Sequence, residues 1–411
     1  MDKNVLRVGI GFATGRKHFQ KVLRSYIGNW KESGLVDNIN VSLNLFVAYD
    51  LNYMGTKRTD YTAIPSDINE FIDSRHFIGL GEVEEAKSFL IENGIVGARE
   101  ASLVFQKGYA SSRNIILYEA IKNNMDCVLF LDDDEYPMAV TRNPETALWS
   151  GQHILKTHLT NIENADITYG YHCGYISPIP SLEYSENLKE EDFRRYIKAI
   201  SNDIVNWDTI QKVIANGGVT YADSSVLASG KVIEVPEVNH AKFISGSNLC
   251  INLSKPERVF PFYNPPGARG EDTFLSTCLS ERKVLRIPCY AFHDGFGSYN
   301  HLLSGVLPTR LKPIKADSEH IVKRFYNACI GWTRYKPLLM YITDRDGYES
   351  KILEMERNLD NTLPLICDYF DTSIFNNVKK ELHKYEKNVK VHYSEFTEIK
   401  DIWSEITSSL L

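Results

Sequence analysis

The chain has 411 residues, of which 43% are hydrophobic and 24% charged, and its formal net charge is −7 at pH 7. This composition is typical of a globular protein of about two to three domains, and the acidic balance disfavours a nucleic-acid-binding face, which would be basic. Seven scattered cysteines without a Cys-x-x-Cys pair are typical of reduced thiols. The start resembles no signal peptide, and no run of about 18 apolar residues occurs, so we expect a soluble cytoplasmic protein.

Strand-like and helix-like segments alternate through the first half of the chain. Short apolar runs rich in β-formers predict strands, and apolar residues three to four positions apart predict helices. The predicted strands span 5–12, 41–49, 101–105 and 127–131, and the predicted helices span 17–31 and 108–123. This rhythm predicts an α/β fold with a mostly parallel sheet flanked by helices.

The second half predicts fewer strands and then mostly helices. We expect strands at 166–176 and 242–253, a short helix at 271–281, and mainly helical structure from 321 onward. Two polar intervals, 55–100 and 182–240, have the composition of insertions, and the second contains a charged helix near 189–201. A Pro-containing linker near 305–320 predicts two domains, 1–305 and 306–411.

Four consecutive acids follow the predicted strand at 127–131: Asp132, Asp133, Asp134 and Glu135. Open α/β sheets bind ligands at the carboxyl ends of their strands. Adjacent carboxylates repel one another unless a cation lies among them, and Mg²⁺ or Mn²⁺ held by such oxygens also binds phosphate. The segment therefore predicts a site for a metal-bound phosphorylated ligand, with a solvated acidic turn as the simpler alternative.

The glycine-rich loop at 9–15 resembles a dinucleotide fingerprint only weakly. Its spacing is Gly-x-Gly-x-x-x-Gly, and the next strand-end acid, Asp50, lies beyond the usual offset of about 20 residues. An NAD enzyme would also have no use for the acidic segment. We expect this loop to hold the nucleotide part of another ligand, with Thr14 and Arg16 as polar contacts. A tight strand-to-helix turn is the alternative.

A haloacid-dehalogenase-type phosphatase is a second rival, because its nucleophile strand also ends in Asp-x-Asp. In that class the motif normally opens the core domain and is followed by Thr or Val. Here it lies on the fourth predicted strand and is followed by Glu135, Tyr136 and Pro137. The position and the following residues disfavour this class.

Further segments carry residue types suited to the same ligand. Arg113 lies near a predicted helix start, where an arginine can meet a phosphate or hold an aspartate, although surface arginines are commoner. Gly246 interrupts a strand pattern, which indicates close approach of the backbone to another group. Glu271 and Asp272 begin a helix, where acids also serve as simple dipole partners. His293 ends a strand and is a candidate metal ligand.

In their order and spacing these segments resemble the GT-A glycosyltransferases, and within them the inverting family 2, which uses nucleotide-sugar donors. The resemblance covers about residues 4–300 and rests on segments 110–114, 132–134, 246–248, 261–262, 270–272 and His293. The first loop, 12–16, departs from the Tyr-Asn sequence usual in that family. The two insertions have no family counterpart, which leaves the acceptor site open.

The resemblance implies transfer of a sugar from a nucleoside diphosphate sugar to a hydroxyl of a glycan or glycoconjugate, with inversion. A Mn²⁺ or Mg²⁺ ion would be held by Asp132, Asp134 and His293. Asp272, or less readily Glu271, would be the catalytic base. The implied donor-binding residues are Thr14, Arg16, Asp50, Arg113, Asp132, Asp133, Gly246 and Asn248. We expect Asp132 toward the ribose and Asp134 on the cation, because alternate residues of an extended strand share one face.

Two other functions stay open on the same scaffold. A nucleotidyltransferase would hold a triphosphate with Gly11, Gly15, Arg16 and Lys17, but segment 270–272 would then have no task. A non-catalytic sugar-nucleotide-binding protein is the second alternative. In the C-terminal region, basic and aromatic residues at 320–326 and 332–336 are typical of half-buried helices, and they also fit peripheral contact with an anionic membrane.

Overall fold

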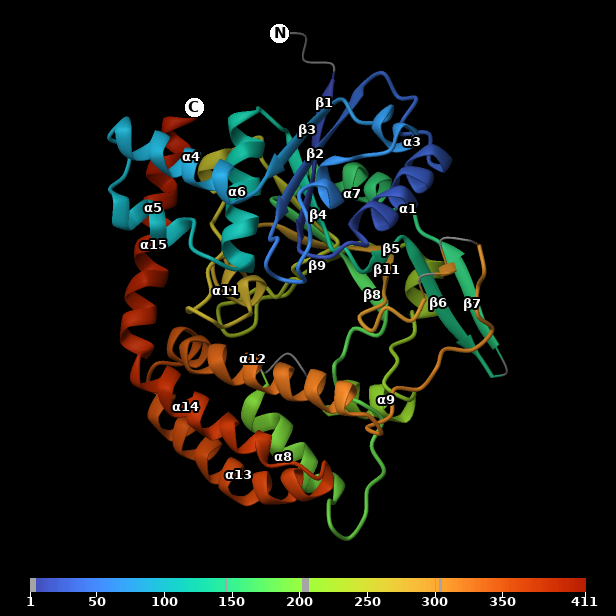
Figure 1. The fold of residues 1–411 in the computed structure, drawn as a ribbon, viewed down its shortest axis with the longest axis vertical. Helices are drawn as coiled ribbons and strands as arrows, with labels where there is room; N and C mark the ends of the chain where they lie inside the picture. The colour runs from blue at the N-terminus through green and yellow to red at the C-terminus, as the bar shows by residue number, and fades with distance from the viewer. Residues whose placement is uncertain (1–4, 145, 202–206, 300, 303–304) are drawn as a thin grey trace.

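The computed structural model describes residues 5–144, 146–201, 207–299, 301–302 and 305–411. It has an α/β fold with one large mixed sheet and a helical C-terminal region (Figure 1). The strands are β1 Leu6–Thr14, β2 Val41–Tyr49, β3 Ser74–Ile78, β4 Cys127–Leu131, β5 Glu135–Tyr136, β6 Met138–Asn143, β7 Thr146–Gly151, β8 Ile167–Gly174, β9 Ile233–Glu234, β10 Leu249–Asn252 and β11 Val284–His293. The helices of the first 300 residues are α1 Phe19–Glu32, α2 Thr59–Thr62, α3 Ser66–Asn69, α4 Leu80–Glu92, α5 Ala98–Val104, α6 Tyr109–Lys122, α7 Ile154–Ile162, α8 Glu190–Ile200, α9 Trp207–Ala215, α10 Ser224–Ser229, η1 Pro256–Arg258 and α11 Glu271–Ser276. Beyond them lie α12 Glu319–Thr343, α13 Tyr348–Tyr369, η3 Ser373–Asn376, α14 Asn377–Lys387 and α15 Val389–Ser409.

The main sheet has the strand order β3-β2-β1-β4-β10-β8-β11-β5, with β9 beside β11. Strands β3, β2, β1 and β4 are parallel, but β10 runs antiparallel between β4 and β8. The expectation of a mostly parallel sheet is therefore wrong, and the sheet is mixed. Because β10 runs backward, its first residue, Leu249, pairs with Phe130 near the end of β4. The segment just before β10 is thus delivered to the same sheet edge as the acidic segment after β4.

Alternate residues of the strands enter two different hydrophobic clusters, one on each face of the sheet. In β4, Val128 and Phe130 join one cluster, whereas Leu129 and Leu131 join the other, as the two-residue period of a strand requires. Helices α1 and α7 contribute to the second cluster. The predicted apolar face of α1 (Val22, Leu23, Tyr26, Ile27 and Trp30) is buried there.

Residues 101–105 are not a strand, and this expectation is wrong. They belong to α5, whose first turn is closed because the Gly97 amide donates to the Glu100 carboxylate at 2.5 Å. Ala101 and Val104, three positions apart, are buried on one face. This short segment has four apolar residues, Ala101, Leu103, Val104 and Phe105, whose spacing fits either a helix or a strand, so only packing distinguishes the two. The third parallel strand is instead β3, within the predicted insertion 55–100.

The C-terminal region is mainly helical, as expected. Its buried side chains share one continuous hydrophobic cluster with a face of the sheet, and the division at 305 stays a prediction. Helix α12 lies beside α11, where the Tyr335 and Phe274 rings meet edge-on with centroids 6.4 Å apart. Helix α8 packs on α13, so the second predicted insertion joins the C-terminal helices (Figure 1). In the part of the chain that the structure describes, every helix is too short or too polar to cross a membrane.

Candidate active site

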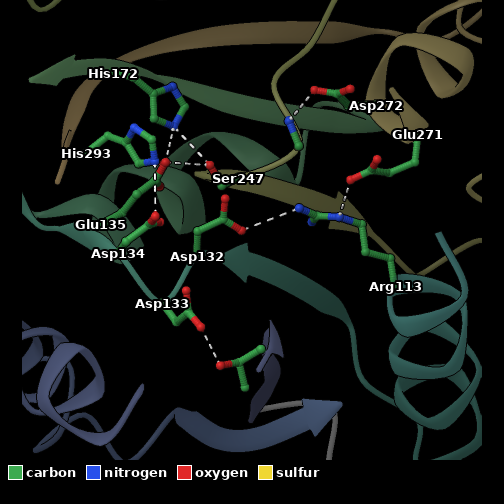
Figure 2. A network of polar contacts seen from close by, with 12 residues as sticks. Arg113, Asp132, Asp133, Asp134, Glu135, His172, Ser247, Glu271, Asp272 and His293 are labelled. Atoms are coloured by element: carbon green, nitrogen blue, oxygen red, sulfur yellow. Dashed lines mark hydrogen bonds and ion pairs between the residues drawn. The ribbon is translucent and has the colours of Figure 1, made fainter. Parts of the chain in front are cut away.

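The acidic segment follows β4, a strand whose five residues are all buried. Its four carboxylates point in different directions, and each meets different partners (Figure 2). Asp133 and Glu135 are buried, whereas the side chain of Asp132 is 36% exposed. A solvated turn is excluded for the two buried acids, because ionised groups leave water only where partners replace it.

Asp133 is held by the loop that follows β1. The Thr14 hydroxyl donates to its Oδ2 at 2.5 Å, and the Arg16 guanidinium donates to its Oδ1 at 2.8 Å. Arg16 also forms an ion pair with Asp134. Burial would lower the pKa of Arg16, but the two aspartates raise that pKa above its usual value. The structure thus brings the predicted loop residues Thr14 and Arg16 into direct contact with the acidic segment.

Asp134 faces His293, the last residue of β11. The Nε2 atom of His293 lies 3.3 Å from Asp134 Oδ2, and its Nδ1 donates to the Tyr175 carbonyl at 2.9 Å. Burial would lower the pKa of His293, but Asp134 raises it to about 9. Burial would raise the pKa of Asp134, but His293 and Arg16 bring it well below its usual range. Two of the three predicted metal ligands therefore meet as an ion pair.

Glu135 belongs to a buried network that the sequence did not indicate. Its Oε1 accepts a hydrogen bond from the Ser247 hydroxyl at 2.8 Å and lies 3.3 Å from His172 Nε2. His172 Nε2 and Ser247 Oγ are themselves 3.1 Å apart (Figure 2). The other carboxylate oxygen, Oε2, is buried without a hydrogen-bond partner among the described residues. Glu135 comes from β5, His172 from β8 and Ser247 from the segment before β10, so this network joins two strands and the start of a third.

Arg113 links the acidic segment to the start of α11. It is 4% exposed, which excludes a surface role. Its Nη2 lies 3.5 Å from Asp132 Oδ1, and its Nε lies 3.4 Å from Glu271 Oε1. The guanidinium carbon is 5.2 Å from the Phe130 ring centroid and 5.5 Å from that of Phe262. Burial and the charge of Glu135 raise the pKa of Asp132 to about 7, against the effect of Arg113.

Asp272 is fixed by two backbone groups. Its Oδ2 accepts a hydrogen bond from the Gly246 amide at 3.1 Å, and its Oδ1 accepts one from the Thr273 amide at 2.8 Å. A Cβ at Gly246 would lie 3.2 Å from Arg113 Nη2, so glycine permits this close approach. Burial and the charge of Glu271 raise the pKa of Asp272 to about 6, so Asp272 is still mostly ionised at neutral pH, as its position at a helix start predicts.

Asn248 and Asp50 lie apart from this network. Asn248 is fully buried and has a positive φ of 49°. Its side chain accepts a hydrogen bond from His158 Nε2 at 2.9 Å and donates to the Tyr171 carbonyl at 3.2 Å. These contacts favour a role in shaping the segment before β10. Asp50 is exposed after β2, and its carboxylate accepts a hydrogen bond from the Asn52 amide at 2.9 Å.

The donor set of the site consists of hard oxygen ligands. Across the described residues, no three His, Cys, Asp or Glu side chains form a group that could hold a metal ion by themselves. Mg²⁺ is commonly bound by one or two carboxylates together with substrate phosphates rather than by an all-protein cage. Asp132 and Asp134 fit this second mode, because they are crowded acids on one turn and Asp132 titrates near neutrality.

Neither protein-family models nor curated proteins give a match to this chain. The site is therefore interpreted from its own residues. The sequence did not indicate His172, Glu135 and Ser247 as a group, because they lie on or next to three strands whose pairing the sequence does not reveal. The only signals were a histidine within an apolar strand pattern and a serine between Gly246 and Asn248.

Proposed function

We propose that the protein is an inverting glycosyltransferase of the GT-A type, which moves a sugar from a nucleoside diphosphate sugar to an acceptor hydroxyl. One observation carries the proposal: Arg113 contacts Asp132 on one side and Glu271 on the other. A segment suited to a metal and a diphosphate thus lies next to a second pair of carboxylates. Single displacement needs a metal and diphosphate site, which stabilises the leaving group, and a carboxylate base, which takes the proton of the acceptor hydroxyl.

Asp272 is the proposed base. In single displacement the acceptor oxygen bonds to the anomeric carbon while the bond from that carbon to the diphosphate breaks, and the hydroxyl proton passes to a base. With a pKa of about 6, Asp272 is mostly ionised at pH 7 and still basic enough to accept a proton. Its two hydrogen bonds to backbone amides orient the carboxylate and leave lone pairs free on each oxygen.

The acidic segment is the proposed site for the donor diphosphate. Asp132 and Asp134 would hold Mn²⁺ or Mg²⁺ together with the donor phosphates, and the ion when bound would stabilise the negative charge of the leaving diphosphate. His293 is paired with Asp134 and its pKa is raised to about 9, so it would position Asp134 rather than bind the ion. Asp133 has a different role, because Thr14 and Arg16 hold it against the loop after β1. That loop is thereby positioned beside the acids, where it can contact the nucleotide.

The contacts of Arg113 also bear on the rival functions. A nucleotidyltransferase would leave Glu271 and Asp272 without a task, although Arg113 and the Gly246 amide position both of them beside the acidic segment. A non-catalytic binding protein would gain nothing from an aspartate with a pKa near neutrality. These observations favour a glycosyltransferase whose acceptor is a glycan or glycoconjugate.

The test is incubation with Mn²⁺ and a panel of UDP-, GDP-, ADP-, CDP- and dTDP-sugars, with release of the nucleoside diphosphate as the readout. We expect the chain to consume one of these donors and to give an inverted product by NMR. Asp272→Asn should lower transfer by about two orders of magnitude or more while donor binding stays near normal. The matched control is Asp223→Asn, which changes an acid at the start of α10. The proposal is wrong if no sugar nucleotide binds, or if the product retains its configuration.

A further inference from the structure

Arg324 approaches the candidate active site from the C-terminal region. It lies on α12, which runs across the molecule between the sheet and the other C-terminal helices (Figure 1). Its Nη1 donates to the Gly295 carbonyl, and its guanidinium carbon lies 4.2 Å from the centroid of the Phe296 ring. Within the described ranges, the buried Nε of Arg324 has no hydrogen-bond partner, and no carboxylate forms an ion pair with this side chain.

The surroundings of Arg324 place it beside the acidic segment. A side chain added at Gly295 would meet both Arg324 Nη2 and His293 Cε1, so these two groups are neighbours. Burial lowers the pKa of Arg324, and the positive charges of Arg16 and Arg269 act in the same direction, whereas Asp134 raises it. The positive charges of Arg16 and Arg269 thus act on Arg324, although the three residues come from distant parts of the chain.

Arg269 belongs to the same group and comes from the loop before α11. Its stem lies against α12, with Cδ 3.7 Å from the position that a Cβ of Gly331 would occupy. Its guanidinium carbon is 5.8 Å from the Tyr109 ring centroid, and Tyr109 meets Tyr53 edge-on at 6.4 Å between centroids. Arg269 is exposed, and among residues that the structure places it has no carboxylate partner. Its head group is therefore accessible to a ligand.

The three arginines differ in their acidic partners. Arg16 pairs with Asp133 and Asp134, whereas no carboxylate among the described residues forms an ion pair with Arg269 or Arg324. Cations that repel one another and are partly desolvated gain from an anion between them. The planar fork of a guanidinium binds phosphate oxygens in pairs, and contacts with aromatic rings limit the freedom of the side chain.

We propose that Arg269 and Arg324 bind a phosphate group of a substrate between α12 and the acidic segment. The inference rests on the proposed glycosyl transfer, because that reaction brings phosphate to this edge of the sheet. The phosphate belongs either to the diphosphate of the donor or to a phosphorylated acceptor. In both cases the C-terminal region contributes to the site through α12.

The experiment is calorimetric titration in the presence of Mn²⁺ with Arg269→Gln, Arg324→Gln and wild-type protein. The first probe is whichever of UDP, GDP, ADP, CDP and dTDP binds the wild type most tightly. The second probe is inorganic phosphate, titrated into protein already saturated with that nucleoside diphosphate. The matched control is Lys323→Gln, which removes a positive charge from an exposed position of the same helix turn. Arg324→Lys keeps the charge without the fork.

We expect each Gln variant to weaken binding of one probe by about tenfold or more, the usual loss for a charged hydrogen bond. Weaker nucleoside diphosphate binding assigns the phosphate to the donor. Unchanged nucleoside diphosphate binding with weaker inorganic phosphate binding assigns it to the acceptor. Lys323→Gln should resemble wild type, and Arg324→Lys should recover part of the affinity.

The proposal is overturned if both Gln variants keep wild-type affinity for both probes, or if Lys323→Gln weakens binding equally. Inorganic pyrophosphate is a third probe, which separates this proposal from the proposed function. The wild type could bind no nucleoside diphosphate and still bind pyrophosphate with an affinity that both Gln variants lower. That result would refute the proposed glycosyl transfer and support the phosphate site. Melting curves check that Arg324→Gln is folded. If Arg324→Gln does not fold, Arg269→Gln still tests the proposal, because Arg269 is exposed.

Discussion

Replacing Arg113 with Gln should move the pH dependence of sugar transfer to higher pH. Arg113 lowers the pKa of both Asp132 and Asp272, against the opposing effect of burial. An opposite charge nearby changes a carboxyl pKa by about 1–3 units, and we take the low end because the effect of Arg113 on Asp272 is smaller than those of burial and Glu271. The pKa of Asp272 should therefore rise from about 6 to about 7 in the variant.

The assay is transfer rate at saturating donor between about pH 5 and 9. A base works only when ionised, so wild-type activity should rise with pH through about 6. A shift of about one unit leaves about a tenth of the base ionised at pH 6 instead of half, so activity there should fall about fivefold further than at pH 8.5. Loss of donor contacts would lower the rate by a similar factor at every pH.

The stability loss of the variant should also depend on pH, but in the opposite sense, because it should appear at high pH. The folded-state pKa of Asp132, about 7, is above its ordinary value of 3.8, so ionising this group as pH rises costs stability. Removing Arg113 increases that cost above about pH 7 and leaves it unchanged at pH 5, where the acid is protonated. We expect a loss of about 1 kcal/mol at pH 8.5, because a shift of one pKa unit corresponds to about 1.4 kcal/mol and Asp132 is 36% exposed.

Arg258→Gln is the matched control for both measurements. Arg258 also pairs with an aspartate, Asp166, at 2.6 Å, but Asp166 lies just before the first residue of β8, whereas the candidate site lies near the last residues of that strand. Its loss should leave the pH profile of transfer unchanged. Coincident profiles for Arg113→Gln and wild type, together with a stability loss that is independent of pH, would refute the electrostatic role of Arg113 and leave it a packing residue.

Three further outcomes can be measured. Asp134→Ala should abolish Mn²⁺-dependent donor binding in titrations while the protein stays folded, and an unchanged Mn²⁺ response would exclude this residue as a ligand. Arg113→Lys should weaken donor binding although the charge is kept, because the planar fork is lost, and an unaltered affinity would contradict this. Ser247→Ala removes a hydrogen bond to buried Glu135 and should lower the free energy of unfolding by about 1 kcal/mol in urea, whereas exposed Ser229→Ala should not.

The local pattern of apolar residues was sufficient to predict several helices and strands. The helix at 19–32 follows from apolar residues three to four positions apart, and the strands at 41–49 and 127–131 follow from short apolar runs rich in β-forming residues. The same holds for the mainly helical C-terminal region. Local pattern failed at 101–105, where four apolar residues fit both a helix and a strand, and the Gly97–Glu100 contact favours the helix.

The candidate site was predicted as a set of residues but not as an arrangement. Residue chemistry indicated the acids at 132–134, Arg113, Glu271 with Asp272, and His293. Which acid meets which partner depends on strand order, and strand order depends on hydrogen bonds between segments far apart in the chain. Sequence periodicity carries no information on such pairings.

Tertiary structure alone decided three features, for one physical reason. The reversed direction of β10 brings Ser247 to Glu135 and the Gly246 amide to Asp272. Burial at that edge raises the pKa of Asp272 to about 6, which a helix start by itself would not do. Packing of α12 against α11 carries Arg324 toward His293. Each feature depends on distances and desolvation between remote residues, and these exist only once the chain is folded.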